Sequence, residues 1–384
     1  MLNPFYWYSI IWLIVIALYG LGFSAINTPL ALDLQAFFFI STIISFFLGF
    51  VLRKIFIYRP LQKKVRITNK LTSIIIIISL AELIYARQIP LISIARGQSE
   101  YGDFTGIPLI HTLLINFIIL YSTYLFYIFI ETHEKAILNK IILQLLPVLL
   151  MFQKGVLILC IFIFVNMAIA KLRINYKVFS LKNIIIICLV LFLVLYINGI
   201  LANIRSGFSW NDSSSIYETA LITHWPKFIP QQLIWTYTYI TTPLGNLNQI
   251  LNNFSGSIHY DQLVASILPV TFVKQVTPMS ISNLDYNILL VPAMNACTGY
   301  LSVALSGGIV GIYFLTIMAN IIVAVFSIWL QRKEYRSPMD GILCMMMTFL
   351  FFYDTFSTAQ TSLLILMIWL FYKMPRIKNK RLHN

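Results

Sequence analysis

The stretch NIIIICLVLFLVLYINGILANIRSGFSW, residues 183–210, decides the fold class. Residues 183–203 are mostly apolar and carry no charge, which matches the ~20 residues that a helix needs to cross a bilayer. The run ends beside Arg205 and passes into polar residues. We therefore predict a membrane-spanning helix over 183–203 that ends next to a positive charge.

The composition of the whole chain agrees with this stretch. Of 384 residues, 59% are hydrophobic and 10% are charged, and the mean hydropathy is +0.84. A soluble domain carries about 25% charged residues, so too little polar surface is present to coat a water-soluble globule. These proportions argue against a soluble enzyme, a disordered protein and a disulfide-stapled module, and they favour a polytopic membrane protein.

We predict an all-α polytopic membrane protein with about ten transmembrane helices. The fifth and sixth are separated only by Gln153 and Lys154, and the fifth contains Pro147, so they form either a tight hairpin or one kinked helix. No Lys or Arg precedes the first run, which favours a retained span over a signal peptide. The predicted spans are 5–25, 34–52, 71–90, 108–130, 139–152, 155–170, 183–203, 306–330, 341–358 and 360–373.

Loop charges predict the orientation, because cytoplasmic loops are rich in Lys and Arg. Five segments that alternate onto one side hold 21 of the 27 basic residues, namely 53–70, 131–140, 171–182, 331–340 and the tail from Lys373. We place these segments, and both termini, in the cytoplasm. Most of the +14 net charge then faces anionic inner-leaflet lipid, and nucleic acid is not a predicted partner.

Six basic residues remain on the outer side or within the membrane, against the orientation bias. They are Arg87, Arg96, Lys154, Arg205, Lys227 and Lys274. Topology does not explain them, so we expect some of them to bind an anion.

Two outer segments are longer than simple turns. Residues 91–107 combine Arg96 with two acidic residues and three glycines, and residues 204–305 form the longest polar stretch. Its apolar, aromatic runs 228–254 and 262–273 predict short interfacial or re-entrant helices. We therefore divide the chain into a transmembrane region 1–203, a large outer loop 204–305 and C-terminal spans with a basic tail, 306–384.

The candidate site residues each have a structural and a functional interpretation. Arg205 can reach lipid headgroups, or its guanidinium can hold a phosphate or pyrophosphate. Arg96 can pair with a neighbouring acid or bind the same ligand, and Lys154 lies at the tip of a turn. Glu82 and Arg87, five residues apart on one helix, are poorly placed for each other, so we expect each to pair with another helix or to line a cavity.

The outer loop also supplies candidate bases and stacking groups. His224, followed by Lys227, and His259, followed by Asp261, are either exposed loop histidines or groups that take a proton from a sugar hydroxyl. The aromatic residues of the loop, Tyr239 among them, either anchor it at the headgroups or stack on sugar rings. His111, at the start of the fourth predicted span, is interpreted as a packing or capping residue.

Missing motifs narrow the chemistry. The chain has no Walker A loop, no HExxH, no GxSxG and no Asp-x-Asp pair in an outer loop. The first outer loop, 26–33, is too short to hold a metal-dependent catalytic segment. If the chain transfers sugars, we expect it to work without a metal or another cofactor.

Several local features resemble the Wzy-type O-antigen and capsule repeat-unit polymerases. Arg205 in NIRSG, the segment YTYITTPLGNLNQIL (237–251) and the Gly-rich YLSVALSGGIVGIYF (300–314) resemble elements of that family, as do the basic inner loop and the dominant late outer loop. The resemblance covers most of the chain but is diffuse, and no single motif is specific.

The resemblance implies a GT-C-like membrane fold in the bacterial plasma membrane. It also implies metal-independent glycosyl transfer between undecaprenyl-pyrophosphate-linked glycans, which serve as donor and acceptor, with a chain-length regulator as a possible partner protein. Related O-antigen ligases use an arginine and a histidine of the large loop, which corresponds here to Arg205 with His224 or His259. The alternatives are such a ligase, and a flippase or transporter of lipid-linked oligosaccharides, against which the single long outer loop argues.

Overall fold

The computed structural model describes residues 2–61, 69–95, 104, 106–174, 181–254, 256–268, 289, 291–330, 336–358 and 361–373. Within these ranges the regular secondary structure is helical, apart from one isolated antiparallel bridge between Ser24 and Ile222. Contacts divide the chain into two units, Met1–Gln62 with Phe162–Thr358, and Lys63–Ile161 with Ala359–Asn384.

The first unit holds most of the helices. Those that lie wholly within it are α1 (Pro4–Tyr19), α2 (Leu32–Val51), α8 (Leu181–Arg205), α9 (Ser214–Thr219), α10 (Leu233–Asn252), α11 (Tyr260–Ile267), α13 (Leu301–Leu330) and α14 (Arg336–Phe349). The boundary between the units passes through α7 (Lys154–Ile174). The second unit contains α3 (Lys70–Tyr85), α4 (Pro90–Ala95), α5 (Ile110–Thr132), α6 (Lys135–Leu150) and α15 (Leu363–Lys373).

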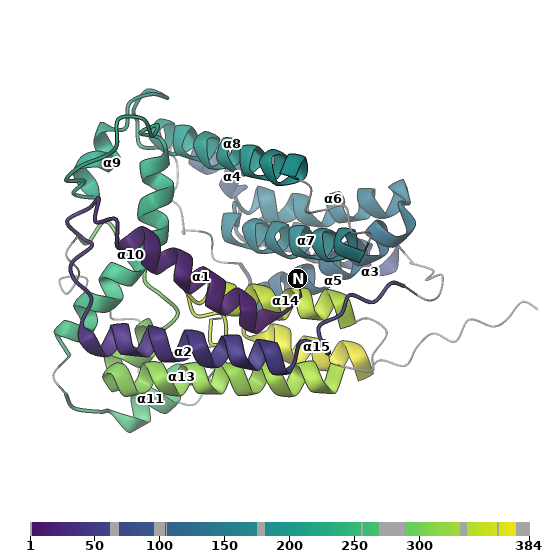
Figure 1. The fold of residues 1–384 in the computed structure, drawn as a ribbon. Helices are drawn as coiled ribbons and strands as arrows, with labels where there is room; N and C mark the ends of the chain where they lie inside the picture. Colours follow the sequence, from purple (N-terminus) through teal and green to yellow (C-terminus); the bar gives the residue numbers. More distant parts are fainter. Residues whose placement is uncertain are drawn as a thin grey trace, which may run out of the picture. The chain divides into compact units, whose positions relative to one another are not determined.

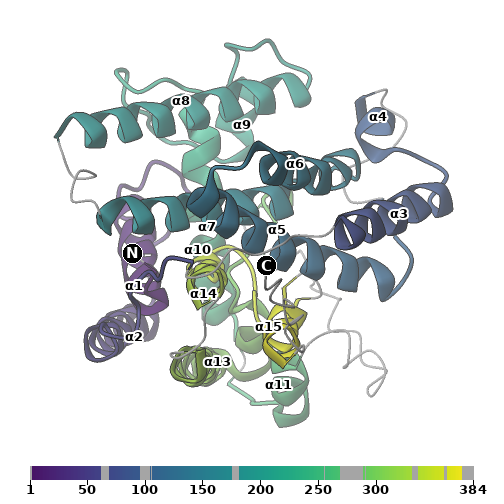
Figure 2. The ribbon, with the colours of Figure 1, turned by 90° about the vertical axis from the view of Figure 1, so that its right-hand side faces the viewer.

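Helix α10 lies across the long helices of the first unit (Figure 1). Helices α2, α13 and α14 are seen end-on in Figure 2, whereas α10 runs roughly at right angles to them. It packs against α1, α8 and α13. The outer segment was predicted to contain short helices, and α9, α10 and α11 are helices there.

Aromatic rings and buried hydroxyl groups form the core between α1, α2 and α13. The Trp12 ring packs against Phe38 and stacks on Tyr300, with centroid distances of 4.3 and 5.8 Å. The hydroxyls of Tyr8 and Tyr300 lie 2.9 Å apart, and Thr316 Oγ1 donates to Tyr300 at 3.1 Å. The hydroxyl groups of these three residues are therefore hydrogen-bonded to one another, which avoids the cost of burying them unpaired.

Loops that were predicted to share a side of the membrane contact each other in the first unit. On the predicted outer side, the Asn248 side chain donates to Thr28 Oγ1 at 3.0 Å and to the Pro29 carbonyl at 3.1 Å. On the predicted inner side, the Arg59 amide donates to Ser337 Oγ at 2.8 Å. These contacts join segments that are about 200 or more residues apart in the sequence, and they agree with the predicted alternation of spans.

Four helices of the described ranges are long and apolar enough to cross a membrane. They are α2, α5, the part of α7 over Lys154–Leu172, and α13, and two shorter apolar stretches are Pro4–Tyr19 and Phe192–Ile204. Their length and composition are those of a membrane-embedded protein. The predicted count of about ten spans is not confirmed, because α3, α6, α14 and α15 have 16, 16, 14 and 11 residues.

Several predicted boundaries differ from the structure. The fifth and sixth predicted spans form two helices, α6 and α7, joined by a turn at 151–153, and not one continuous helix. Pro147 lies in the last turn of α6, and its missing N–H interrupts the helical hydrogen bonds shortly before the helix ends at Leu150. The third predicted span is shorter than expected, because α3 ends at Tyr85 and Arg87 follows it with φ 52°.

Helix α14 begins with a buried ion pair. Arg336 Nε lies 2.7 Å from Asp340 Oδ2, and both side chains are almost completely buried. The residues are four apart on the same helix, the spacing at which side chains of opposite charge meet. The Arg336 guanidinium also lies over the Phe56 ring, 5.4 Å from its centroid.

Candidate functional site

The outer end of α8 carries the first candidate residue. Arg205 is the last residue of this helix, close to the predicted end at 203, and its side chain lies outside the described part of the structure. Gly207 follows with φ 84°, a conformation that favours glycine, and it turns the chain toward α9. Helix α8 thus ends at the basic residue that the sequence predicted to follow the span, Arg205.

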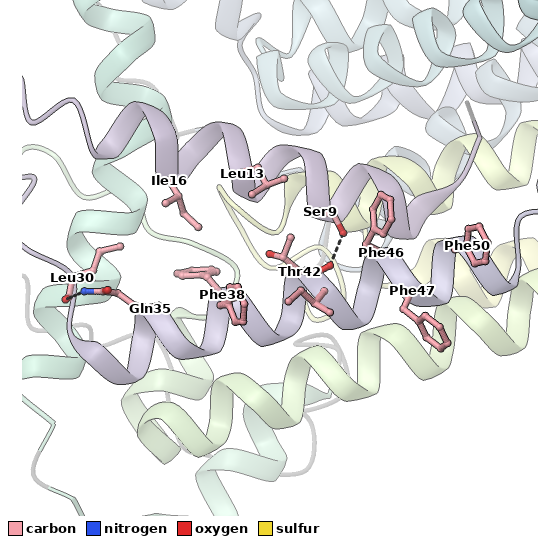
Figure 3. A pocket seen from close by; sticks show the side chains of 12 residues that line it. Ser9, Leu13, Ile16, Leu30, Gln35, Phe38, Thr42, Phe46, Phe47 and Phe50 are labelled. Carbon is pink, nitrogen blue, oxygen red and sulfur yellow. Dashed lines mark hydrogen bonds between the residues drawn. The ribbon is translucent and has the colours of Figure 1, made fainter.

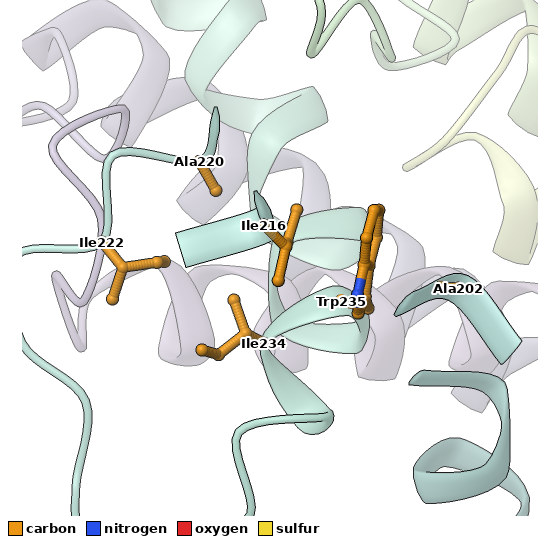
Figure 4. Close-up of a cluster of buried hydrophobic side chains, with 6 residues drawn as sticks. All are labelled: Ala202, Ile216, Ala220, Ile222, Ile234 and Trp235. Atoms are coloured by element: carbon orange, nitrogen blue, oxygen red, sulfur yellow. The ribbon is translucent and has the colours of Figure 1, made fainter. Parts of the chain in front are cut away.

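A buried apolar cluster joins this helix end to the outer segment (Figure 4). Its members are Ala202, Ile216, Ala220, Ile222, Ile234 and Trp235, which come from α8, α9, the following loop and α10. Ala202 precedes Arg205 by three residues, and Ile222 precedes His224 by two. The backbone positions of Arg205 and His224 are therefore anchored by the same cluster, which we call the outer cluster.

Hydrogen bonds from one side chain of α8 reinforce the outer cluster. Asn203 Oδ1 accepts from Trp235 Nε1 at 2.7 Å, and Asn203 Nδ2 donates to Ser213 Oγ at 3.0 Å. Asn203 also donates to the Trp210 carbonyl at 3.3 Å. One amide thus connects α8, the segment before α9, and α10. Asn203 was not among the predicted site residues, although the sequence shows its amide side chain two residues before Arg205.

His224 lies at the surface next to an aromatic group. Its ring contacts Phe23 edge-on, with centroids 5.1 Å apart, and its Nδ1 lies 3.2 Å from Thr223 Oγ1. The imidazole is exposed, so it is accessible to a ligand. Among the described residues no carboxylate lies within ion-pair distance of this ring.

Two tyrosines of α10 behave differently. Tyr237 is buried, its hydroxyl accepts from the Phe23 amide at 3.1 Å and from Asn27 Nδ2, and burial raises the pKa of its phenol. Tyr239 is 39% exposed and stacks on Trp235, with ring centroids 6.2 Å apart. Tyr237 therefore stabilises the fold, whereas Tyr239 keeps a partly open ring face of the kind that can stack on a sugar.

The second candidate histidine belongs to another part of the first unit. His259 precedes α11 directly, and its amide donates to the Ser306 carbonyl of α13 at 2.9 Å. Helices α9 and α11 lie at opposite ends of this unit in both views (Figures 1 and 2). The structure thus groups His224 with the end of α8 and does not group His259 with them.

The second unit contains a histidine–carboxylate pair. His111 Nδ1 lies 2.8 Å from Glu82 Oε2, and the side chains are 20% and 0% exposed. Glu82 was predicted to pair with another helix, and it does so. His111 was interpreted as a packing or capping residue, and in addition its ring forms this pair. Glu82 lies in the outer half of the third predicted span, and His111 lies at the outer start of the fourth. Their similar depth in the membrane was the signal that the sequence offered.

The remaining predicted residues lie apart. Arg87 is exposed just beyond α3, and Lys227 is exposed in the loop before α10. Lys154 begins α7, and its Nζ lies 4.1 Å from the centroid of the Phe152 ring, as suits a residue at a turn. Arg96 and Lys274 lie outside the described residues.

An apolar groove follows the length of α1 and α2 on the surface of the first unit (Figure 3). Its volume is about 810 Å³, and its lining includes Leu13, Ile16, Phe38, Phe46, Phe47 and Phe50. Ser9 Oγ donates to the Thr42 carbonyl at 3.0 Å within it, and Gln35 Nε2 donates to the Leu30 carbonyl at 2.7 Å near one end. The groove has no titratable side chain, and its apolar surface is of the type that faces hydrocarbon.

Among the described residues no group of three or more His, Cys, Asp or Glu side chains could hold a metal ion. The chain matches no family model, no curated protein and no solved structure. The site must therefore be interpreted from its own chemistry.

Proposed function

We propose that this chain is a membrane glycosyltransferase that polymerises lipid-linked oligosaccharide repeat units. The substrates are undecaprenyl-pyrophosphate-linked glycans at the outer face of the bacterial plasma membrane, and the product is O-antigen or capsular polysaccharide. Both termini of the chain lie in the cytoplasm in this proposal.

The observation that carries the proposal is the outer cluster. It anchors the backbone at Ala202, beside Arg205, and at Ile222, beside His224, in one packed structure. Arg205 supplies a cation for a lipid pyrophosphate at the outer end of a membrane helix. The exposed imidazole of His224 supplies a hydrogen-bonding group for a glycan. The exposed aromatic face of Tyr239 adds a stacking surface on the same helix as Trp235 of the cluster.

The roles follow from the charge that changes during the reaction. The bond between the anomeric carbon of the donor and its pyrophosphate oxygen breaks, and the pyrophosphate leaves with the electron pair. The acceptor hydroxyl forms the new bond to that carbon and gives its proton to the imidazole of His224, which passes it on to solvent. Arg205 offsets the charge that grows on the pyrophosphate, an effect that is larger in a partly desolvated site. His224 hydrogen-bonds to the glycan. No divalent metal is required for these roles.

Deletion of the gene in its host tests the proposal. We expect surface glycan that is one repeat unit long on an intact lipid core, and complementation should restore the ladder of longer chains. A full ladder in the deletion strain would overturn the proposal. Finished polymer that accumulates on undecaprenyl pyrophosphate would identify a ligase instead, and repeat units trapped at the cytoplasmic face would identify a flippase.

Point variants then test the assigned residues. Arg205→Ala should give the short glycan with normal protein levels in the membrane, because the leaving pyrophosphate loses its counter-charge. His224→Ala should shorten the ladder, whereas His259→Ala should not, since His259 lies at the other end of the unit. A ladder of normal length from Arg205→Ala would refute the role of Arg205.

A further inference from the structure

We propose that His111 and Glu82 form a hydrogen-bonding subsite for a sugar hydroxyl of the lipid-linked glycan. This inference rests on the proposed function, and it concerns the second unit by itself. His111 would contact the ligand, and Glu82 would be a positioning residue that acts through the imidazole.

The geometry fixes which nitrogen is available. Glu82 lies in the last turn of α3 and His111 in the first turn of α5, and Glu82 Oε2 lies 2.8 Å from His111 Nδ1. A carboxylate accepts hydrogen bonds, so Nδ1 is the donor to Glu82, and Nε2 is the ring nitrogen left for a ligand. No described residue bonds to Nε2, and the side chain is 20% exposed. The ring therefore presents Nε2 for a hydrogen bond with a hydroxyl group, which can donate or accept.

The neighbouring residues hold the ring in this orientation. Phe104 contacts it edge-on, with centroids 5.5 Å apart. Gly106 lies so close that a Cβ atom there would come within 2.7 Å of the imidazole. Only glycine thus allows the chain before α5 to pack against the ring, and the imidazole cannot rotate freely away from Glu82.

A second observation marks the pair as incomplete. Glu82 is fully buried, yet its Oε1 atom has no hydrogen-bond partner among the described residues. A buried unpaired acceptor is costly, by about 1–3 kcal/mol. A ligand hydroxyl that reached this carboxylate would supply the missing hydrogen bond.

The charges around the pair favour a neutral ligand. The carboxylate of Glu82 repels anions, and the other charged side chains of α3, α5 and α6 are at the opposite ends of their helices from the pair: Lys70, Glu131, Lys135 and Lys140. At this end of the helices the described part of the unit also carries Arg87, beyond the end of α3, and Lys154, at the start of α7. A hydroxyl group, which hydrogen-bonds to Nε2 without bringing a charge, fits these groups best.

Two substitutions separate binding from packing. The amide of asparagine places its nitrogen near Nδ1 and has no atom at Nε2, so His111→Asn keeps a donor for Glu82 and removes the ligand contact. Glu82→Gln keeps the volume and loses the fixed acceptor. His133→Asn is the matched control, because His133 ends the same helix α5 with φ 55° and is exposed.

The experiment measures the binding of lipid-linked repeat units, extracted from the deletion strain, to the full chain in lipid nanodiscs by titration calorimetry. His111→Asn should raise the dissociation constant about ten- to a hundredfold, as expected for loss of one hydrogen bond at a polar buried site. Glu82→Gln should raise it less, and His133→Asn should leave it unchanged. Each variant must elute as a single species with a thermal midpoint close to that of the wild type.

The possible failures are distinguishable. Equal binding by wild type and His111→Asn would overturn this inference and leave the proposed function standing. No binding by the wild type would overturn both. If His111→Asn does not fold, the value for Glu82→Gln decides, and binding equal to the wild type would overturn the subsite.

Discussion

Trp235 Nε1 donates a hydrogen bond of 2.7 Å to Asn203 Oδ1, and this bond joins the end of α8 to the start of α10. Both side chains are buried, so neither can exchange its partner for water. Since Asn203 lies two residues before Arg205, the position of the candidate arginine depends on a bond made elsewhere in the chain.

Asn203→Ala should therefore destabilise the protein. The substitution removes the acceptor of Trp235 Nε1 and the donor to Ser213, and leaving such buried groups unpaired costs about 1–3 kcal/mol. We expect a lower thermal midpoint in detergent. Asn252→Ala, at an exposed position in the last turn of α10, is the control and should not shift it. Equal midpoints for the two variants would contradict the role of Asn203.

The contact between the first predicted outer loop and the large outer segment is open to cross-linking. Ser24 and Ile222 form an antiparallel bridge, and the flanking amides of Ala25 and Thr223 make the backbone hydrogen bonds. The Cα atoms of such a non-hydrogen-bonded pair are about 4.5 Å apart, within the range of a disulfide. The double variant Ser24→Cys with Ile222→Cys should cross-link under mild oxidation.

A shift in mobility on a non-reducing gel would report this cross-link. The native cysteines should first be replaced by serine or alanine, and each single cysteine variant serves as control. Failure of the double variant to cross-link in folded protein would show that the two loops do not meet.

Gly199→Ala should disturb the packing of α8 against α10. A Cβ atom at Gly199 would lie 2.0 Å from the Gln232 carbonyl oxygen, and a backbone atom cannot move aside cheaply. Overpacking of this type costs about 1–3 kcal/mol, against a gain of about 1 kcal/mol from the better helix propensity of alanine. Gly155→Ala has nothing within 4 Å of its Cβ and should be neutral or slightly stabilising. Thermal midpoints of the two variants, compared with wild type, provide the measurement.

Cys297 should react slowly with maleimide in the folded protein. The thiol is 8% exposed, and burial raises its pKa to about 12, so almost no thiolate forms near neutral pH. In a variant whose other cysteines are replaced, labelling at pH 7.5 should be weak until SDS unfolds the chain. In the control, Cys297 is replaced as well and a single cysteine is introduced at exposed Glu218, where it should label at once. Rapid labelling of native Cys297 would refute its burial.

The helical fold and the end of α8 could be predicted because they depend on local properties. Apolar runs without charge determine where helices lie, and the run 183–203 leads to a helix that ends at Arg205. The alternation of loop charge predicted which segments share a side, and the contact between Arg59 and Ser337 agrees with it.

The pairings that build the sites could not be predicted in this way. The partner of Glu82 depends on how α3 packs against α5, and no periodicity reports that packing. Hydropathy alone also overestimates helix length: α14 ends at Phe349, and the apolar residues that follow form turns in which Asp354 accepts amide hydrogen bonds from Phe356 and Ser357.

The ion pair of α14 has a consequence for biosynthesis. A charged side chain within a membrane helix is costly, most of all at the helix centre, and the pair of α14 lies in its first two turns. Arg336 and Asp340 lie one helical turn apart, so their bond needs no other helix and can close as soon as α14 becomes helical. The pair can thus form at the start of α14 before the remaining helices are in place to bury it.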